Sequence, residues 1–285
     1  MSVRPEDYAS RVEIAWCPGC GNRPILEAVK AALVALDLAP QRVVICSGIG
    51  QAPKLPHYLR VNTFNGLHGR ELVSACAVKM AAPDLCVLVH AGDGGAYGEG
   101  GNHLLHAIRR NVDLTLVVHD NKTYALTKGQ ASPTSDAVEG TRVTVLGAAA
   151  APLNPLALAI SQGCSFVART SSALPEHLQE MIQAAVRHRG FSLLHVLQPC
   201  VVWDRVHTYA YYRERCEPIG ARHDPRDARA AFALALQDGE RIPVGIFYTA
   251  DRPVYDPSAT SGLDRPSREL PVDPDRVRDR FSRFR

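Results

Sequence analysis

Short runs of apolar residues alternate with longer helical patterns over most of this chain. Nearly every side chain is apolar in six strand-like runs: 42–46, 85–91, 114–119, 165–169, 192–197 and 243–248. Apolar residues that return every three or four positions predict helices between them, over 25–38, 70–81, 101–110, 156–162 and 175–188. Strands that are apolar on both faces and alternate with helices are typical of a parallel sheet covered by helices on both sides. We therefore expect one doubly wound α/β domain.

This pattern stops near both ends of the chain. Beyond Asp251 charged residues alternate with five prolines, and no apolar period remains: Pro253, Pro257, Pro266, Pro271 and Pro274. Such a segment cannot build its own core. We expect an N-terminal segment (1–24), an α/β domain (25–250) and an extended C-terminal arm (251–285). The arm is either disordered or lies along a partner chain.

Composition excludes several classes of protein. The 285 residues are 46% hydrophobic, which is enough for a sizeable core. Lys and Arg number 32 against 29 Asp and Glu, and this small excess is spread along the chain, so neither nucleic-acid nor membrane binding is expected. A membrane-spanning run and a secretory signal are both missing from the sequence. We expect a cytoplasmic protein whose eight cysteines are reduced.

Chemically informative residues follow the predicted strands. In open α/β sheets, ligands bind at the carboxyl ends of the strands. Gly92-Asp93-Gly94-Gly95 can approach a phosphate through backbone N–H groups. Asp93, Asn121 and the carbonyl of Thr123 could hold Mg²⁺, although a glycine-rich turn or an Asn turn alone is often only structural. GDG followed by Asn 28 residues later is similar to the thiamine diphosphate-binding signature, in which Asp and Asn hold the Mg²⁺ that bridges the diphosphate.

Four cysteines call for an explanation beyond packing. Cys17 and Cys20 have the spacing of a metal-binding pair, and Cys46 and Cys200 follow predicted strands. Four thiolates at one place suit Zn²⁺ or an iron–sulfur cluster, although for Cys46 alone a core position is equally plausible. The remaining four are interpreted as small buried hydrophobic residues: Cys76, Cys86, Cys164 and Cys216.

Several motifs together carry a specific resemblance. WCPGCG, CSGIG, NGLHGR, GDGGAYGEGG and HDNKTYALTKGQASPTS occur in this order, and IPVGIFYTADRPVYD follows near the end. Over residues 16–255 the chain resembles the β subunit of 2-oxoacid:ferredoxin oxidoreductases. The resemblance implies a fold of the thiamine diphosphate-binding type (the diphosphate half), with an N-terminal segment that binds one [4Fe–4S] cluster.

Site residues can be carried over from this resemblance by position. The implied cluster ligands are Cys17, Cys20, Cys46 and Cys200, and the implied Mg²⁺ ligands are Asp93, Asn121 and the carbonyl of Thr123. The residues expected near the diphosphate are Gly92, Gly94, Gly95 and His68. Those expected at the cofactor's rings and linker are Ser47, Gly48, Ile49, Gly50, Tyr124, Ala125 and Leu126. The sequence departs from the family at Gln51, where many members have Cys or another small residue; this puts local packing in doubt.

The resemblance also implies an incomplete enzyme. The pyrimidine-binding half of the thiamine site is missing, so an α subunit should supply it, together with the activating Glu and the coenzyme A site. The C-terminal arm is a plausible clasp for this subunit, and two heterodimers should pair as (αβ)₂. The implied reaction is the reversible, coenzyme A-dependent oxidative decarboxylation of a 2-oxoacid, with electrons passing through the cluster to ferredoxin.

The substrate is predicted from the loop that follows Asn121. Lys128 could pair with the distal carboxylate of a substrate, and LTKGQ resembles the 2-oxoglutarate-using and broad-specificity branches. We therefore expect oxidation of 2-oxoglutarate to succinyl-CoA and CO₂, with Lys128 and His68 as candidate catalytic residues. Lys128 could also be only a solvated loop cation, with pyruvate or several 2-oxoacids as substrates. A non-redox thiamine decarboxylase subunit and a cluster-bearing scaffold without catalysis are the remaining alternatives.

Overall fold

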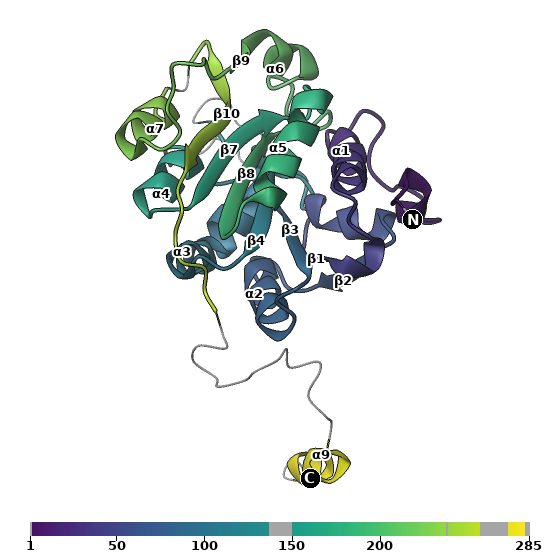
Figure 1. Ribbon diagram of the computed structural model, residues 1–285. Helices are drawn as coiled ribbons and strands as arrows, with labels where there is room; N and C mark the ends of the chain where they lie inside the picture. The colour runs from purple at the N-terminus through teal and green to yellow at the C-terminus, as the bar shows by residue number, and fades with distance from the viewer. Residues whose placement is uncertain (1, 137–149, 238, 257–272, 283–285) are drawn as a thin grey trace.

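A computed structural model describes residues 2–136, 150–237, 239–256 and 273–282. Within them, eight strands form one sheet in the order β2-β1-β3-β4-β8-β7-β10-β9 (Figure 1). Their bounds are β1 Val43–Ser47, β2 Asn62–Asn65, β3 Cys86–Gly92, β4 Leu114–Asp120, β7 Phe166–Ser171, β8 Phe191–Leu197, β9 Cys216–Pro218 and β10 Ile242–Thr249. A separate short pair consists of β5 (Thr123–Tyr124) and β6 (Gln130–Ala131). The predicted α/β sheet is confirmed.

The direction of the strands at one edge of the sheet differs from the prediction. All neighbouring strands from β2 to β7 run parallel, whereas β10 pairs antiparallel with β7, and β9 runs alongside β10. An antiparallel edge on an otherwise parallel sheet is common. The apolar run 243–248 could not reveal this, because the pattern of a buried strand is the same in both directions.

Helices cover both faces of the sheet. On one face α1 (Asn22–Ala35) packs beside α5 (Pro175–Arg187), as Figure 1 shows. The helices of the other face are α2 (Glu71–Ala81), α3 (Gly101–Arg110), α4 (Pro155–Ser161) and α7 (Ala228–Ala235). Because successive side chains of a strand point to opposite faces, Val43 and Ile45 of β1 join the α1 layer, and Val44 and Cys46 join the α2 layer. This alternation decides the position of Cys46.

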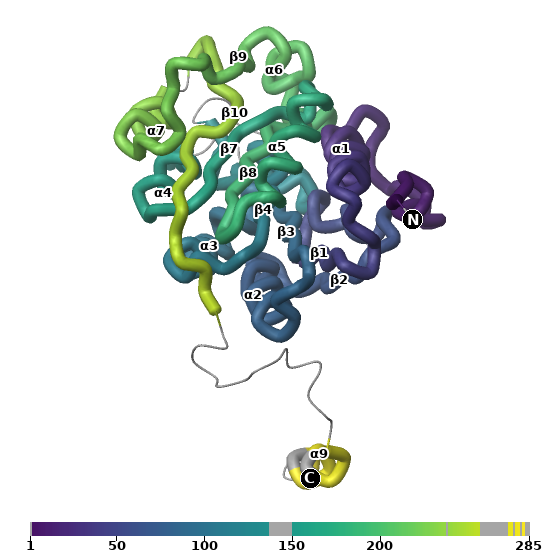
Figure 2. Tube along the Cα trace, viewed as in Figure 1, coloured from purple at the N-terminus to yellow at the C-terminus, as the bar shows by residue number. Residues whose placement is uncertain are grey.

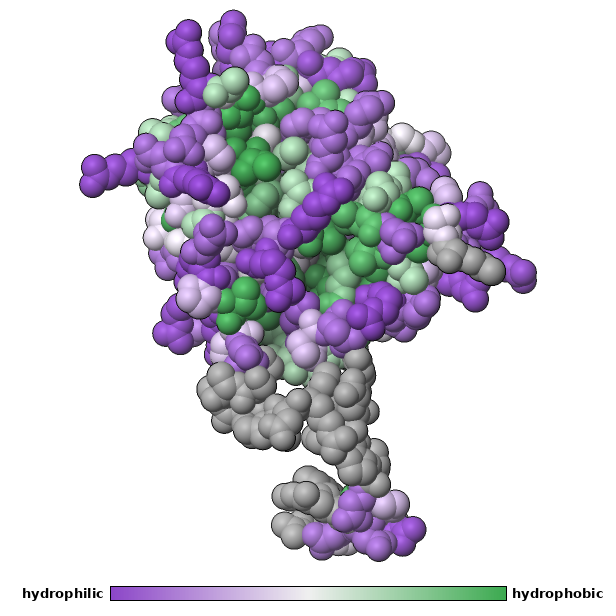
Figure 3. All heavy atoms as spheres, viewed as in Figure 1, coloured by the Kyte–Doolittle hydropathy of each residue, from purple (hydrophilic) through white to green (hydrophobic). Residues whose placement is uncertain are grey.

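The sequence pattern missed several short elements. The edge strand β2 has four exposed residues and so shows no apolar face. The helix α6 (Tyr209–Arg215), strand β9 and helix α7 were not predicted, and α1 begins at Asn22 rather than at residue 25. A 3₁₀ stretch, η3 (Ala52–Tyr58), follows β1 and leads towards the edge strand. In the space-filling view, polar residues cover most of the surface, and apolar residues gather beside α1 (Figure 3).

The C-terminal region is only partly extended. Residues 251–256 run past the end of α3 (Figure 2), where the Asn111 side chain donates to the carbonyls of Arg252 and Pro253, at 3.2 and 3.1 Å. Pro274–Ser282 form a helix, α9, so the prediction of an extended arm is wrong there. Proline disrupts a helix interior but suits its first turn, which is where Pro274 stands. Residues 257–272, on which the rest of that prediction rests, lie outside the described ranges.

A further structural finding concerns membranes. In the described ranges, none of the helices combines the length and the apolar character that a bilayer crossing requires.

Candidate functional site

A cavity of about 160 Å³ lies at the carboxyl ends of β3 and β4. It brings together twelve of the predicted site residues: Ile49, Gly50, His68, Gly92, Asp93, Gly94, Gly95, Asn121, Thr123, Tyr124, Ala125 and Leu126. Its remaining lining residues are Gln51, Ala52, Pro53 and Thr127. The segments that follow separate strands in the sequence therefore meet in one cavity.

The glycine-rich turn packs directly under an aromatic ring. After β3 ends at Gly92, Asp93 begins one turn of π-helix, η4 (Gly94–Glu99), which continues into α3. A Cβ atom on Gly94 would lie 2.3 Å from the ring of Tyr124, so only glycine fits there without movement. The Tyr124 hydroxyl lies 3.2 Å from a carboxylate oxygen of Glu99, which holds the ring over the turn.

Two carboxylates share one hydroxyl beside this turn. The Oγ1 atom of Thr134 lies 2.8 Å from Asp93 Oδ2 and 2.6 Å from Asp120 Oδ1, and all three side chains are buried. A hydroxyl has one proton and cannot donate to both carboxylates. Burial and the neighbouring Asp120 carboxylate raise the pKa of Asp93 to about 7. A divalent cation would stabilise the charged form of Asp93, so its surroundings fit a metal ligand.

The Asn121 turn supplies further oxygen atoms to the cavity. Asn121 Oδ1 accepts a 3.1 Å hydrogen bond from the backbone N–H of Thr123, a turn in which Lys122 takes a left-handed conformation with φ of 56°. Asn121 and Thr123 both line the cavity with Asp93. Carboxylate, amide and backbone carbonyl oxygens are the donors that Mg²⁺ takes in proteins. The donor chemistry of these three residues therefore fits Mg²⁺.

His68 is fixed at the cavity by two partners. Its Nδ1 lies 3.0 Å from the carbonyl oxygen of Ile49, and its Nε2 lies 3.0 Å from Glu99 Oε2. The next residue, Gly69, has a φ of +71°, and a Cβ there would lie 2.6 Å from the backbone of Glu99. Glycine at this position therefore lets the loop before α2 close against η4 and present His68.

The sequence reasoning missed Glu71, which lies beneath the same turn. Its side chain is buried, and its Oε1 would be 2.9 Å from a Cβ placed on Gly95. Glu71 Oε2 has no hydrogen-bond partner, and burial raises the pKa of this carboxyl. An acidic residue directly after HGR is its only sequence signal. A buried polar atom without a partner is costly and often marks a functional site.

A buried polar network also escaped prediction. Tyr97 Oη lies 2.9 Å from His195 Nδ1, and His195 Nε2 lies 3.2 Å from Asp120 Oδ2. Through Thr134 this chain of contacts reaches Asp93. Burial alone would raise the pKa of Asp120, but its hydrogen bond and charge interaction with His195 outweigh burial and lower it. Asp120 is thus held as an anion behind Asp93.

Of the residues predicted at the cofactor and the substrate, three do not line the cavity. The Asn65 amide donates to Ser47 Oγ and to the carbonyl of Gly48, both at 2.8 Å. These two residues do not line the cavity, and their hydrogen bonds hold the loop that follows β1. Lys128 follows the last lining residue, Thr127, and is exposed, with a φ of 78°. Its predicted contact with substrate stays a prediction.

The four predicted cluster cysteines do not meet. Cys20 lies near Cys17 and Cys200, which contribute with burial to a raised pKa of its thiol. Cys46 is fully buried on the opposite face of the sheet, packed with Leu72 and Ala75 of α2. In this structure Cys46 therefore lies apart from the CxxC segment, because position 46 of the strand faces the α2 layer, and its role as the fourth ligand stays a prediction.

The remaining cysteines behave as expected in part. All eight are free thiols, and Cys164 and Cys216 are buried, whereas Cys76 and Cys86 are half-buried. Among the residues that the structure describes, no group of three or more His, Cys, Asp or Glu side chains is arranged so that it could hold a metal ion.

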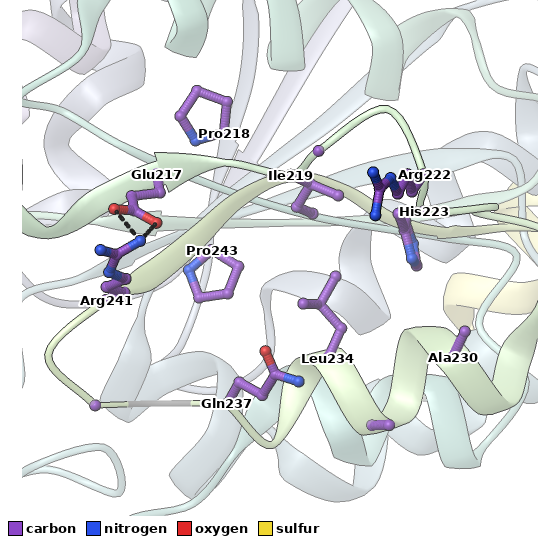
Figure 4. A pocket seen from close by; sticks show the side chains of 13 residues that line it. Glu217, Pro218, Ile219, Arg222, His223, Ala230, Leu234, Gln237, Arg241 and Pro243 are labelled. Carbon is purple, nitrogen blue, oxygen red and sulfur yellow. Dashed lines mark hydrogen bonds and ion pairs between the residues drawn. The ribbon is translucent and has the colours of Figure 1, made fainter.

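A larger hollow lies elsewhere on the molecule. It has a volume of about 620 Å³ and opens between β9, β10 and α7 (Figure 4). Glu217 and Arg241 form a 3.2 Å ion pair at one side, while Ile219 and Leu234 face each other across it. It contains none of the predicted site residues, and β4, β8 and β7 separate it from β3. Size alone therefore does not identify the functional site.

Comparison with known proteins decides the family. Residues 44–196 match the family described as thiamine pyrophosphate enzyme, C-terminal TPP binding domain, and residues 200–261 match the C terminal of the pyruvate ferredoxin oxidoreductase beta subunit. The β subunit of 2-oxoacid:ferredoxin oxidoreductase 1 from Aeropyrum pernix is 38% identical, over 97% of this chain and 95% of the relative. This chain is a β subunit of the 2-oxoacid:ferredoxin oxidoreductase family.

Two further relatives agree with this assignment. The 2-oxoglutarate oxidoreductase subunit KorB of Mycobacterium tuberculosis is 35% identical, over 91% of this β subunit and 73% of the relative. A solved structure of 2-oxoglutarate:ferredoxin oxidoreductase from Magnetococcus marinus, with 2-oxoglutarate, coenzyme A and succinyl-CoA bound, superposes with a TM-score of 0.89. It is 34% identical and covers 96% of this chain and 94% of that one. The family expected from the motifs is confirmed, and with it an oxidoreductase subunit.

Proposed function

We propose that this β subunit, together with an α subunit, oxidatively decarboxylates 2-oxoglutarate to succinyl-CoA and CO₂ and passes the electrons to ferredoxin. The observation that carries the proposal is the single cavity that joins the glycine-rich turn, Asp93, Asn121 and His68. The likeness to a structure with 2-oxoglutarate and coenzyme A bound supports the substrate and the acyl acceptor.

The residues of the cavity suit thiamine diphosphate and Mg²⁺. Asp93, Asn121 and the Thr123 carbonyl would hold the metal, and the turn from Gly92 to Gly95 would receive the diphosphate through its backbone N–H groups. When bound, thiamine diphosphate supplies the electron sink for decarboxylation of the 2-oxoacid. His68, held by Ile49 and Glu99, would line the cavity near the diphosphate.

An α subunit is supported by what this half of the site lacks. At about 160 Å³ the cavity is smaller than the roughly 300–1,000 Å³ of typical small-molecule sites, as expected when a second chain completes it. Two of its lining residues, Ile49 and Leu126, are 45% and 43% exposed. Apolar side chains that gather at such a rim are typical of a surface covered by a partner. We propose (αβ)₂ as the assembly.

The [4Fe–4S] cluster implied by the family does not fit the four cysteines first assigned to it. Because Cys46 faces the α2 layer, only Cys17, Cys20 and Cys200 lie together. The free thiols support a reducing compartment such as the cytoplasm.

Catalysis by the complex tests the proposal. The full chain, produced with its α subunit and purified without oxygen, should reduce ferredoxin only when 2-oxoglutarate, coenzyme A and thiamine diphosphate are all present. Succinyl-CoA and CO₂ should form in equal amounts. Equal activity with pyruvate would show that the enzyme accepts several 2-oxoacids and does not prefer 2-oxoglutarate. CO₂ release without reduction of the acceptor would instead favour the non-redox decarboxylase.

A further inference from the structure

A short hairpin lines the candidate cofactor cavity. It runs from β5 to β6, and five consecutive residues of it, 123–127, border the cavity. Among the described residues, β5 and β6 pair with each other and lie outside the eight-stranded sheet. The position of this hairpin therefore depends on its contacts with neighbouring segments, and not on the main sheet.

The tip of the hairpin has an unusual backbone conformation. Lys128 and Gly129 are both left-handed, with φ of 78° and 101°. The N–H of Gly129 donates to the carbonyl of Tyr124 at 3.0 Å, which closes the tip. A residue other than glycine rarely takes this conformation, and where it does, the surrounding structure holds it there. The tip therefore needs support from outside the hairpin.

Trp203 packs against this tip. A Cβ placed on Gly129 would lie 2.9 Å from Cε3 and 3.1 Å from Cδ2 of Trp203, so the backbone of Gly129 lies directly against the indole ring. Trp203 belongs to the segment 200–207, which follows β8, and it does not line the cavity. It therefore acts on a molecule in the cavity through the hairpin rather than by contact.

The same segment also reaches the base of the hairpin. His207 Nε2 lies 3.1 Å from Asp136 Oδ2, and Asp136 Oδ1 lies 3.0 Å from Lys122 Nζ. Lys122 directly precedes β5, and it also donates to the carbonyl of Thr134 at 3.2 Å. Asp136 thus links His207 to the two chain segments that enter and leave the hairpin.

Segment 200–207 is itself held in one conformation. The N–H groups of Val206 and His207 donate to Asp204 Oδ1 at 2.9 and 3.0 Å, and His207 Nδ1 lies 2.6 Å from Asp204 Oδ2. Burial alone would lower the pKa of His207, but its hydrogen bonds to Asp136 and Asp204 outweigh burial and raise it to about 9. At neutral pH His207 is therefore charged and can donate to both carboxylates at once.

We propose that segment 200–207 positions the hairpin for the 2-oxoacid, with Trp203 at the tip and His207 at the base as positioning residues of the reaction. The proposal rests on the proposed function, in which a 2-oxoacid enters the cavity that residues 123–127 line. Without support at its tip the hairpin no longer keeps one position, so the substrate should bind more weakly. The rate of the bound complex should change less, because neither Trp203 nor His207 lines the cavity.

Steady-state kinetics of the αβ complex with 2-oxoglutarate test this proposal. Trp203→Ala should raise KM by about tenfold or more and change kcat much less. Trp203→Phe keeps an aromatic ring against Gly129 and should keep a KM close to that of the wild type. Val202→Ala is the matched control, because Val202 is the preceding residue of the same segment and is 44% exposed. Its KM should not change.

Two further variants test the two ends of the hairpin. His207→Leu removes the contact with Asp136 and should raise KM in the same direction. Gly129→Ala places a Cβ against the ring of Trp203 and should also raise KM. When Gly129→Ala is combined with Trp203→Ala, the ring is gone, so the combined rise in KM should be smaller than the product of the two separate rises.

Other outcomes would overturn the proposal. An unchanged KM in Trp203→Ala would contradict it, and so would an equal rise in Val202→Ala, which would indicate a general loss of structure. Rises that multiply fully in the double variant would mean that Gly129 and Trp203 act independently. All three results leave the proposed function intact, because the wild type still oxidises 2-oxoglutarate. A wild-type complex that oxidises no 2-oxoacid would overturn the proposed function and this proposal together.

Discussion

Gly94 lies against the face of Tyr124 so closely that a Cβ at position 94 would be 2.3 Å from a ring carbon. Both residues line the candidate cofactor cavity, Gly94 from the turn after β3 and Tyr124 from the segment after β4. The contact therefore ties together the two strand ends that carry Asp93 and Asn121.

Replacement of this glycine should damage cofactor binding. In Gly94→Ala the Tyr124 ring must move, and overpacking of this kind costs about 1–3 kcal/mol. We expect thiamine diphosphate affinity to fall by about tenfold to a hundredfold in a calorimetric titration of the αβ complex. Gly101→Ala is the matched control, because a Cβ there meets nothing within 4 Å. Equal affinities of the two variants would contradict the packing account.

The buried carboxyl of Glu71 should make stability depend on pH. Burial raises its pKa, the charge of His68 partly offsets this effect, and the nearby Glu99 adds to it. A raised carboxyl pKa means that the folded state disfavours the ionised form. The penalty is absent below the ordinary Glu pKa and grows as the pH rises through the folded-state pKa.

Glu71→Gln should therefore stabilise the chain in alkaline but not in acidic solution. We expect the free energy of unfolding to rise more at pH 8 than at pH 5. Glu27→Gln is the control, since Glu27 is exposed and paired with Lys30, and it should show no such pH dependence. A gain of equal size at both pH values would mean that the effect does not arise from ionisation.

The substrate preference should depend on the charge of Lys128. If Lys128 pairs with the distal carboxylate of 2-oxoglutarate, Lys128→Ala should lower the ratio of kcat/KM for 2-oxoglutarate over pyruvate by about tenfold or more. Lys128→Arg keeps the charge and should keep most of the preference. An unchanged ratio in Lys128→Ala would leave Lys128 as a solvated loop cation, as its exposure also allows.

Much of the site could be predicted because it follows directly from strand ends. Glycines, Asp93 and Asn121 come after apolar runs, and a parallel sheet brings such ends together, as the shared cavity confirms. Glu71 and Thr134 could not be predicted in this way. They contact the lining residues Gly95 and Asp93 from a helix and from a loop, and such contacts leave no periodic pattern in the sequence.

Cys46 and Pro274 show two other limits of the sequence pattern. A run of five buried residues reveals a strand but not which face each side chain takes, and the face decides whether Cys46 meets Cys17. The prolines and the missing apolar period predicted an extended arm, yet at position 274 proline opens a helix. In both cases the same residue pattern is compatible with opposite local arrangements.

The measurement that tests the central claim most directly is a calorimetric titration of the αβ complex with thiamine diphosphate in the presence of Mg²⁺, for the wild-type protein and for Asp93→Asn. This variant removes a carboxylate that lies near Asp120 and lines the cavity, and it keeps the side-chain shape. We predict about one thiamine diphosphate per β subunit in the wild type and an affinity weaker by about a hundredfold in Asp93→Asn. Equal affinity in both proteins, or no binding by the wild type, would contradict the assignment of this cavity to the cofactor.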